Sequence, residues 1–376
     1  MSDRRWFPVS VLFLISLPSC LSAQQPAAWH DPSPHTIQFI TVDDDVKLEV
    51  LDWGGAGRPL VLMAGLGATA HIFDDFAPKL TAVNHVYGIT RRGFGASSAP
   101  EPTNAKYSAD RLGDDVLAVL DALKLDRPVL VGHSIAGEEL SSVGTRHPER
   151  VAGLIYLDAA YSFAYYDRSQ GDLNIDSQDL QKKLSRLQTD NPSPDQKQLV
   201  GELLRDDLPQ LQSDLQQQQK KLEVPEPKWP SPSAADRESF QAAISWFKSV
   251  NGWVMPEAEL RQEVEATPEG HIGKNHATLG VRQAIISGEQ KYTNLRGPVL
   301  AIFAVPHDLG PFSKSDPVAR AYVASDLAST EAQIKAFQTG VPSARVVRLP
   351  NANHSMFISN EGDVLREIRA FVAGLQ

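Results

Sequence analysis

One short segment constrains the fold of this chain more than any other: residues 132–137, which read Gly-His-Ser-Ile-Ala-Gly. The apolar run 128–131 before it is typical of a buried strand, and residues 138–143 after it read as the start of a helix. A strand, a tight turn of small residues that carries a serine, and a helix form the setting of a nucleophile elbow. Ala136 stands where the G-x-S-x-G pattern has its last glycine, so the assignment needs support from the rest of the chain.

Apolar runs of strand type alternate with amphipathic helical segments along most of the sequence. We expect a hairpin of strands at 35–40 and 46–52, further strands at 59–63, 86–90, 129–132, 151–157, 298–303 and 345–349, and helices at 72–80, 107–123, 316–338 and 361–372. This alternation predicts an α/β fold in which a mostly parallel central sheet is covered by helices on both faces.

The alternation stops between residues 161 and 292. Leucines recur there at helical intervals, and no segment reads clearly as a strand. We therefore expect a helical cap over 161–292, inserted into a core formed by 35–160 and 293–376. Residues 24–34 are rich in Gln, Ala and Pro and are typical of a linker.

The first 23 residues have the composition of a secretory signal peptide. Arg4 and Arg5 precede the apolar run 6–17, and residues 21–23, Leu-Ser-Ala, suit a cleavage site. The run is shorter than the roughly 20 residues that span a bilayer, so we expect an exported protein, periplasmic or secreted, without an integral membrane span. The only cysteine, Cys20, is expected to leave with this peptide; residues 17–20 also resemble a bacterial lipobox, so a lipid anchor through Cys20 is the alternative.

Charge and histidine spacing exclude two classes of protein. The chain has 376 residues and a formal net charge of −10, and it offers no basic face for nucleic-acid phosphates. Its histidines do not follow metal-ligand spacing such as H-E-x-x-H, so we expect no metal. The sequence leaves the oligomeric state open.

Two further residues lie where a serine nucleophile needs them. A Ser hydroxyl reacts only with a base to take its proton and an acid to orient that base. Asp308 follows the strand at 298–303 and His354 follows the strand at 345–349, so the chain order is Ser134, Asp308, His354. Asp158, at the end of the strand at 151–157, is the rival for the acid.

Residues 64–67, Ala-Gly-Leu-Gly, follow a strand and can form an oxyanion loop. Backbone N–H groups must point at the oxygen on which charge develops in acyl transfer, and glycines let the chain turn its amides inward. We assign the two donors to the N–H groups of Leu66 and Ile135.

With these motifs the chain resembles a serine α/β-hydrolase with a helical cap over residues 35–374. Residues 91–97 also resemble the R-G-x-G-x-S loop of that family, and we expect Arg91 and Arg92 to form structural ion pairs. The resemblance implies cofactor-free hydrolysis of an ester, amide or lactone bond, or of a C–C bond, in a small-molecule substrate.

Several functions remain open on this scaffold. Ester or related acyl hydrolysis is our first expectation; alternatives are a C–C or lactone hydrolase with the same triad, a cofactor-free perhydrolase or haloperoxidase, and a non-catalytic binding protein. Ser134 argues against an epoxide hydrolase or a haloalkane dehalogenase, because both need an Asp at the elbow. The cap carries no motif that names the substrate.

Overall fold

A computed structural model describes residues 29–188 and 195–375 of the chain. They belong to two compact units, Met1–Pro32 and Ser33–Gln376, and every helix and strand described below lies in the second unit. The expected signal peptide and Cys20 lie outside the described residues, as does part of the expected linker. Residues 29–35 form neither helix nor strand.

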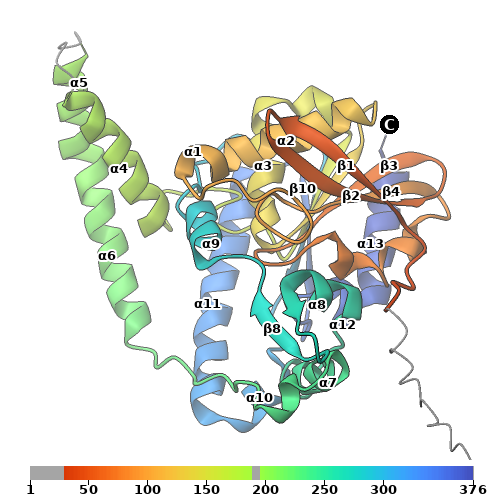
Figure 1. Cartoon of the computed structure of the whole chain (residues 1–376). Coiled ribbons are helices and arrows are strands. Elements are labelled where there is room, and N and C mark those ends of the chain that lie inside the picture. Colours follow the sequence, from red (N-terminus) through yellow and green to blue (C-terminus); the bar gives the residue numbers. More distant parts are fainter. Residues whose placement is uncertain (1–28, 189–194, 376) are drawn as a thin grey trace, which may run out of the picture. The chain divides into compact units, whose positions relative to one another are not determined.

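The centre of the larger unit is an eight-stranded sheet in the order β1-β2-β4-β3-β5-β6-β9-β10 (Figure 1). Its strands are β1 (Thr36–Asp43), β2 (Val46–Gly54), β3 (Arg58–Met63), β4 (Asn84–Ile89), β5 (Val129–His133), β6 (Gly153–Leu157), β9 (Val299–Ala304) and β10 (Ala344–Leu349). Strand β2 pairs antiparallel with β1 and β4, and all other neighbours run parallel. The expected hairpin and the mostly parallel sheet are therefore confirmed.

Helices connect β4 to β5, β5 to β6 and β9 to β10, and further helices lie in the segment 161–292. They are α1 (Asn104–Tyr107), α2 (Ala109–Ala122), α3 (Gly137–Arg146), α4 (Leu173–Leu187), α5 (Gln196–Glu202), α6 (Leu208–Leu222), α7 (Phe240–Asn251), α8 (Glu257–Glu263), α9 (Leu279–Ile286), α10 (Gly310–Ser315), α11 (Pro317–Gly340), α12 (Met356–Ser359) and α13 (Glu361–Ala373).

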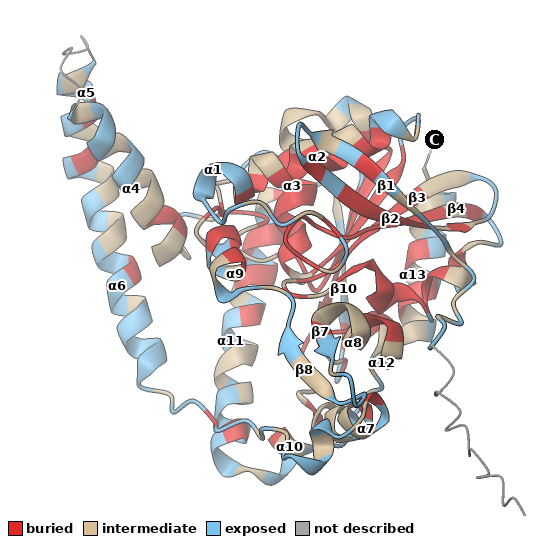
Figure 2. Ribbon diagram, in the orientation of Figure 1, coloured by how far each residue is buried: buried red, intermediate tan, exposed pale blue. Residues whose placement is uncertain are grey.

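The sheet buries side chains on both faces. In β3, Val61 and Met63 point to one side, where they join a core with α2, α3 and α11, whereas Leu60 and Leu62 point to the other, towards α12 and α13. Figure 2 shows the strands as mainly buried. Successive side chains of a strand alternate between faces, so a sheet covered twice needs apolar residues at almost every position. This explains why the central strands read as continuous apolar runs.

Two local expectations were wrong. Residues 72–80 form two short 3₁₀ turns, Ala70–Phe73 and Ala77–Leu80, in place of one helix. Pro78 lies within the second turn, and proline cannot donate the backbone hydrogen bond that a continuous helix requires. The segment 161–292 contains a small hairpin, β7 (Val264–Ala266) with β8 (Ile272–Asn275), whose strands are too short and too polar to show the alternation of a buried strand.

The parallel strands bring several chain segments to one edge of the sheet. The segments that follow β5, β6, β9 and β10 start at the carboxyl ends of four adjacent strands. In open α/β sheets this edge is where ligands bind. Among the described residues, no helix is both long and apolar enough to cross a bilayer.

Candidate active site

Ser134 lies at the sharp turn between β5 and α3. Its φ of 55° is left-handed, a conformation that non-glycine residues seldom adopt outside constrained turns. The turn is closed by tight packing, because a Cβ on Gly132 would lie 2.7 Å from Leu140 Cδ1 and 3.0 Å from the Ala136 carbonyl oxygen. The strand, the left-handed serine and the helix together have the form of a nucleophile elbow.

The departure at Ala136 has a structural explanation. Ala136 has φ −60° and ψ −12°, which any L-residue adopts, and it is fully buried. The close approach falls one residue later, where a Cβ on Gly137 would lie 2.0 Å from the Ala159 carbonyl oxygen. The turn therefore requires glycine at 137, and alanine fits at 136.

His354 pairs with Asp158, the residue that follows β6. The distance from His354 Nδ1 to Asp158 Oδ2 is 2.6 Å. Asp158 is fully buried, and its Oδ1 accepts hydrogen bonds from the Tyr161 hydroxyl at 2.8 Å and the Ala304 N–H at 3.1 Å. This contact holds the imidazole ring and leaves Nε2 of His354 for proton transfer.

The structure does not bring Asp308 to His354, so the expected Asp308–His354 pairing is wrong in its geometry. The carboxylate of Asp308 accepts hydrogen bonds from the Gly310 N–H at 2.9 Å and from Lys314 Nζ at 2.8 Å, at the start of α10. Only the backbone of Asp308 reaches the His354 loop, where its N–H donates to the Ala352 carbonyl. The carboxylate is thus turned towards α10, and the rival acid Asp158 occupies the place beside the base.

A second histidine, which the sequence analysis did not single out for this site, also contacts Asp158. His307 Nε2 lies 2.7 Å from Asp158 Oδ2, and His307 Nδ1 lies 2.6 Å from Asp326 Oδ2 on α11. Burial disfavours a charged ring, but the hydrogen bonds to the two carboxylates outweigh it and raise the pKa of His307 to about 10. Both ring nitrogens of His307 contact carboxylate oxygens, so neither is directed at Ser134.

Asp158 is itself held ionised. Burial favours its neutral form, but the hydrogen bonds from His307 and His354 dominate and hold its pKa well below the ordinary value. Its four acceptor positions are filled by the two imidazoles on Oδ2 and by Tyr161 and Ala304 on Oδ1. A carboxylate with this set of donors is stable in a buried position.

His133, the residue before the nucleophile, links the elbow to the His354 loop. Its Nε2 donates to the His354 carbonyl oxygen at 3.0 Å, and the two rings lie 4.7 Å apart. Burial lowers the pKa of His133 to about 3, with a further contribution from His354, so its ring is neutral. His133 therefore packs and hydrogen-bonds, and its contact places the His354 loop beside the elbow.

The loop at 64–67 lies against the nucleophile. A Cβ on Gly65 would lie 3.1 Å from Ser134 Cβ, so the loop passes directly over the elbow with Leu66 next in the chain. Arg91 fixes the loop, since its guanidinium donates to the carbonyls of Ala64 and Gly65 at 3.0 and 3.3 Å and pairs with Glu139 on α3. The expected structural role of Arg91 is confirmed.

Arg92 has the same kind of role. It forms two hydrogen bonds of 2.6 Å to the buried carboxylate of Asp115 on α2. Both arginines therefore anchor the loop 91–97 to the core.

Two helices of the segment 161–292 contact the chain at residues 67–69, at the end of the 64–67 loop and just beyond it. Glu259 on α8 accepts hydrogen bonds from the Thr69 N–H at 2.8 Å and from its hydroxyl at 2.6 Å. On α9, the Arg282 guanidinium lies so close to Gly67 that a Cβ there would be 2.5 Å from Arg282 Nη2. The segment 161–292 therefore packs against the loop that passes over the elbow.

Three side chains of the site could in principle share a metal ion, because Asp158, His307 and His354 offer ligand atoms within 4.8 Å of one another. Their donor set is already arranged as hydrogen-bonded pairs, with each imidazole N–H directed at a carboxylate oxygen. We therefore assign these residues hydrogen-bonding roles.

Comparison with known proteins places the chain in a family. A profile of the α/β hydrolase fold matches residues 58–361. The chain is 34% identical over 109 residues to a 2-hydroxymuconate semialdehyde hydrolase of Pseudomonas sp. (strain CF600), a match that covers 28% of this chain and 38% of that protein. It is 33% identical over 116 residues to a putative carbamate hydrolase, RutD, of Caulobacter segnis, covering 31% of this chain and 43% of that protein.

These matches span less than half the length of either relative. Among solved structures, E-2-(acetamidomethylene)succinate hydrolase superposes with a TM-score of 0.57 at 14% identity, over 90% of this chain and 100% of that one. This likeness concerns the fold alone. Because the family profile covers most of the chain and the fold agrees with it, the protein belongs to the α/β-hydrolase family.

Proposed function

We propose that this protein is a serine hydrolase that cleaves an ester or a related acyl bond through an acyl-enzyme. The observation that carries the proposal is the 2.6 Å contact between His354 and the buried Asp158, with His354 packed against His133 of the elbow that carries the left-handed Ser134. Ser134 is the nucleophile, His354 the base and Asp158 the orienting acid. The acid is therefore Asp158, in place of the Asp308 that the sequence favoured.

In the first half of the reaction, His354 Nε2 takes the proton from the Ser134 hydroxyl while Oγ forms a bond to the substrate carbonyl carbon. The negative charge moves to the carbonyl oxygen, where the N–H groups of Leu66 and Ile135 stabilise it; each such donor is worth about 2.7–4 kcal/mol. The bond to the leaving group then breaks, and His354 gives its proton to that group.

In the second half, a water molecule replaces the leaving group. His354 takes a proton from the water as its oxygen attacks the acyl carbon, and the bond to Ser134 Oγ breaks as the proton returns to the serine. The products are the carboxylic acid and the regenerated enzyme, and no cofactor enters the balance.

The test is Ser134→Ala with a p-nitrophenyl ester as substrate and a fluorophosphonate probe as label. We expect turnover to fall by a factor on the order of 10⁴–10⁶ and labelling to disappear, while the folded structure persists. Ser185→Ala, at an exposed serine on α4, is the matched control and should keep both activities. Wild-type turnover by the Ser134 variant would refute the proposal.

A C–C hydrolase with the same triad is the second candidate, favoured by the similarity to the 2-hydroxymuconate semialdehyde hydrolase. Its nucleophile and base are the same, but the leaving group is a carbanion that must be stabilised in the substrate. A panel of p-nitrophenyl esters, lactones and β-diketones distinguishes the two: faster turnover of the diketones by the wild-type enzyme, lost in Ser134→Ala, would favour C–C cleavage.

A further inference from the structure

We propose that His307 is a positioning residue for this hydrolysis: an imidazolium held between two carboxylates that fixes Asp158 and tempers the basicity of His354. The inference rests on the proposed function, because it assigns His307 a role towards the Asp158–His354 pair. It adds a charged group to the site that the triad alone does not include.

Geometry makes His307 the bridge between the active site and α11. Its two nitrogens lie 2.7 Å from Asp158 and 2.6 Å from Asp326, and its side chain is 9% exposed. His307 and His354 contact the same oxygen of Asp158, Oδ2, and their ring centroids lie 6.2 Å apart. Both imidazoles thus share one acceptor oxygen, so we expect a change in the charge of one ring to alter the proton affinity of the other.

The groups that face His307 come from four parts of the chain. They are Asp158 after β6, the Tyr161 hydroxyl at 3.5 Å from Nε2, Asp326 on α11, and His354 after β10. The carboxylate of the neighbouring Asp308 is directed at Lys314. Two carboxylates around one imidazolium leave one net negative charge near His354.

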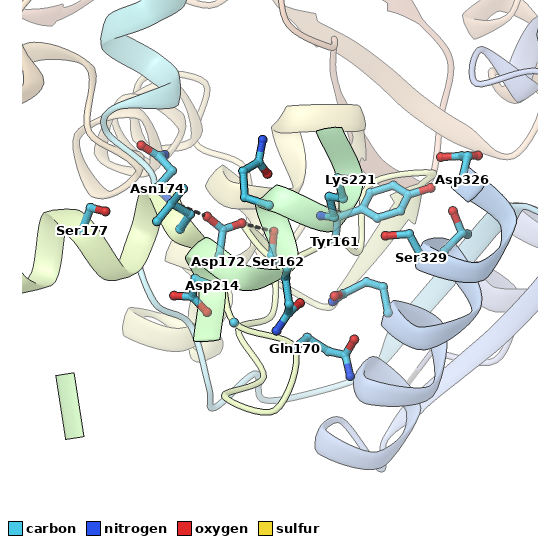
Figure 3. Close-up of a pocket in the computed structure, with 16 residues that line it drawn as sticks. Tyr161, Ser162, Gln170, Asp172, Asn174, Ser177, Asp214, Lys221, Asp326 and Ser329 are labelled. Carbon is cyan, nitrogen blue, oxygen red and sulfur yellow. Dashed lines mark hydrogen bonds between the residues drawn. The ribbon is translucent and has the colours of Figure 1, made fainter. Parts of the chain in front are cut away.

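Asp326 connects this network to solvent. Its side chain is 32% exposed, and with Tyr161 it lines a polar cavity of about 680 Å³ between α4, α6 and α11 (Figure 3). Figure 3 shows Tyr161 and Asp326 on the same side of this cavity. The carboxylate of Asp326 is therefore open to solvent on the side away from Asp158 and His354.

The charge of His307 should influence the base directly. A cation close to Asp158 offsets part of the carboxylate charge that stabilises the protonated form of His354. Removing the cation should make His354 a stronger base, and removing the outer anion Asp326 should make it a weaker one. Charges about 6 Å apart near a protein surface shift a titration by on the order of one pH unit.

The experiment measures the rate of fluorophosphonate labelling of the full chain between pH 5 and pH 10. His307→Gln keeps an N–H for Asp158 but carries no charge. We expect the maximum labelling rate of this variant to stay within about tenfold of the wild type. The pH at which labelling falls to half of its maximum on the acid side should rise by on the order of one pH unit. His307→Phe removes the donor as well, so its plateau should also fall more than tenfold.

A second variant keeps the test decisive if the His307 variants fold poorly. Asp326→Asn removes an anion while His307 keeps its contact with Asp158, so its acid limb should shift downwards. A merely structural role would not give opposite shifts in the two variants. His85→Gln, at a His–Asp pair on β4 and β2 outside this network, is the matched control and should leave the profile unchanged.

The outcomes separate this inference from the proposed function. If Ser134→Ala abolishes labelling but His307→Gln and Asp326→Asn have wild-type profiles, or shift them in the same direction, the role of His307 is refuted and the hydrolase stands. If Ser134→Ala is still labelled at the wild-type rate, the proposed function itself is wrong.

Discussion

Gly137 is the residue at which the elbow helix meets the chain that leaves β6. Any side chain there would enter the space of the Ala159 carbonyl, 2.0 Å from the position of a Cβ. Backbone cannot move aside as a flexible side chain can, and overpacking of this kind typically costs 1–3 kcal/mol. We predict that Gly137→Ala lowers the free energy of unfolding by about 2 kcal/mol or more, measured by urea denaturation, and reduces labelling of Ser134.

Ala136→Gly is the matched control, since it restores the G-x-S-x-G pattern. Ala136 already has helical dihedral angles, so the glycine should give no gain in activity and should cost only about 0.5–1 kcal/mol in unfolding free energy. A large increase in activity, or a cost equal to that of Gly137→Ala, would contradict this account of the turn.

At the scale of secondary-structure elements, the side chain of His71 joins the 3₁₀ turn Ala70–Phe73 to strand β2. Its Nδ1 lies 2.9 Å from Asp74, which also contacts His35 at 3.0 Å, and its Nε2 lies 3.6 Å from Glu49 on β2. Burial opposes the charged ring, but the hydrogen bonds to Asp74 and Glu49 prevail and raise the pKa of His71 from 6.5 to about 10. The turn is therefore held by a buried imidazolium.

This shift gives a signed prediction of stability. The pKa of His71 is higher in the folded protein, so its contribution is complete below about pH 6.5 and is lost as the pH rises towards 10. The difference in unfolding free energy between the wild type and His71→Gln should shrink over this window, by up to about 1.4 kcal/mol per pH unit. Urea denaturation at pH 6, 8 and 10 measures it; a difference that is constant or grows with pH would refute the charge on His71.

The sequence predicts secondary structure well where burial determines which positions of an element are apolar. The central strands were recognisable because both faces are covered, as Leu60 to Met63 illustrate. The hairpin β7–β8 was not recognisable, because its strands of three and four residues leave no room for a periodic signal. The sequence predicted one helix where the 3₁₀ turns at 70–80 lie, because the proline near the end of this apolar segment interrupts a helix without changing the spacing of the apolar residues.

At the scale of the whole molecule, the active site is assembled from segments that are far apart in the chain. The sequence predicted that Ser134 and His354 would meet, because each follows a strand of the same parallel sheet. It favoured Asp308 over Asp158 as the acid, although both follow strands next to each other in the sheet, β6 and β9, and only the direction of the side chain separates them. The contacts of His307 could not be predicted from the sequence for a similar reason, because its partner Asp326 lies 19 residues later, on α11.

The cap segment is the part whose function the sequence describes least. Its helices α8 and α9 contact Thr69 and Gly67 through Glu259 and Arg282, so we expect changes in the cap to reach the loop at 64–67. Family membership does not name the substrate, since one fold hosts many reactions. The substrate panel applied to the proposed function is therefore also the test of what this cap admits.

The central claim is that Asp158, and not Asp308, orients the base that activates Ser134. The most direct measurement compares Asp158→Asn with Asp308→Asn in ester turnover and in the rate of fluorophosphonate labelling. We predict that Asp158→Asn lowers kcat by a factor on the order of 10⁴, because the imidazole loses its orienting carboxylate, while Asp308→Asn stays within about threefold of the wild type. Full activity in Asp158→Asn together with a large loss in Asp308→Asn would contradict the account.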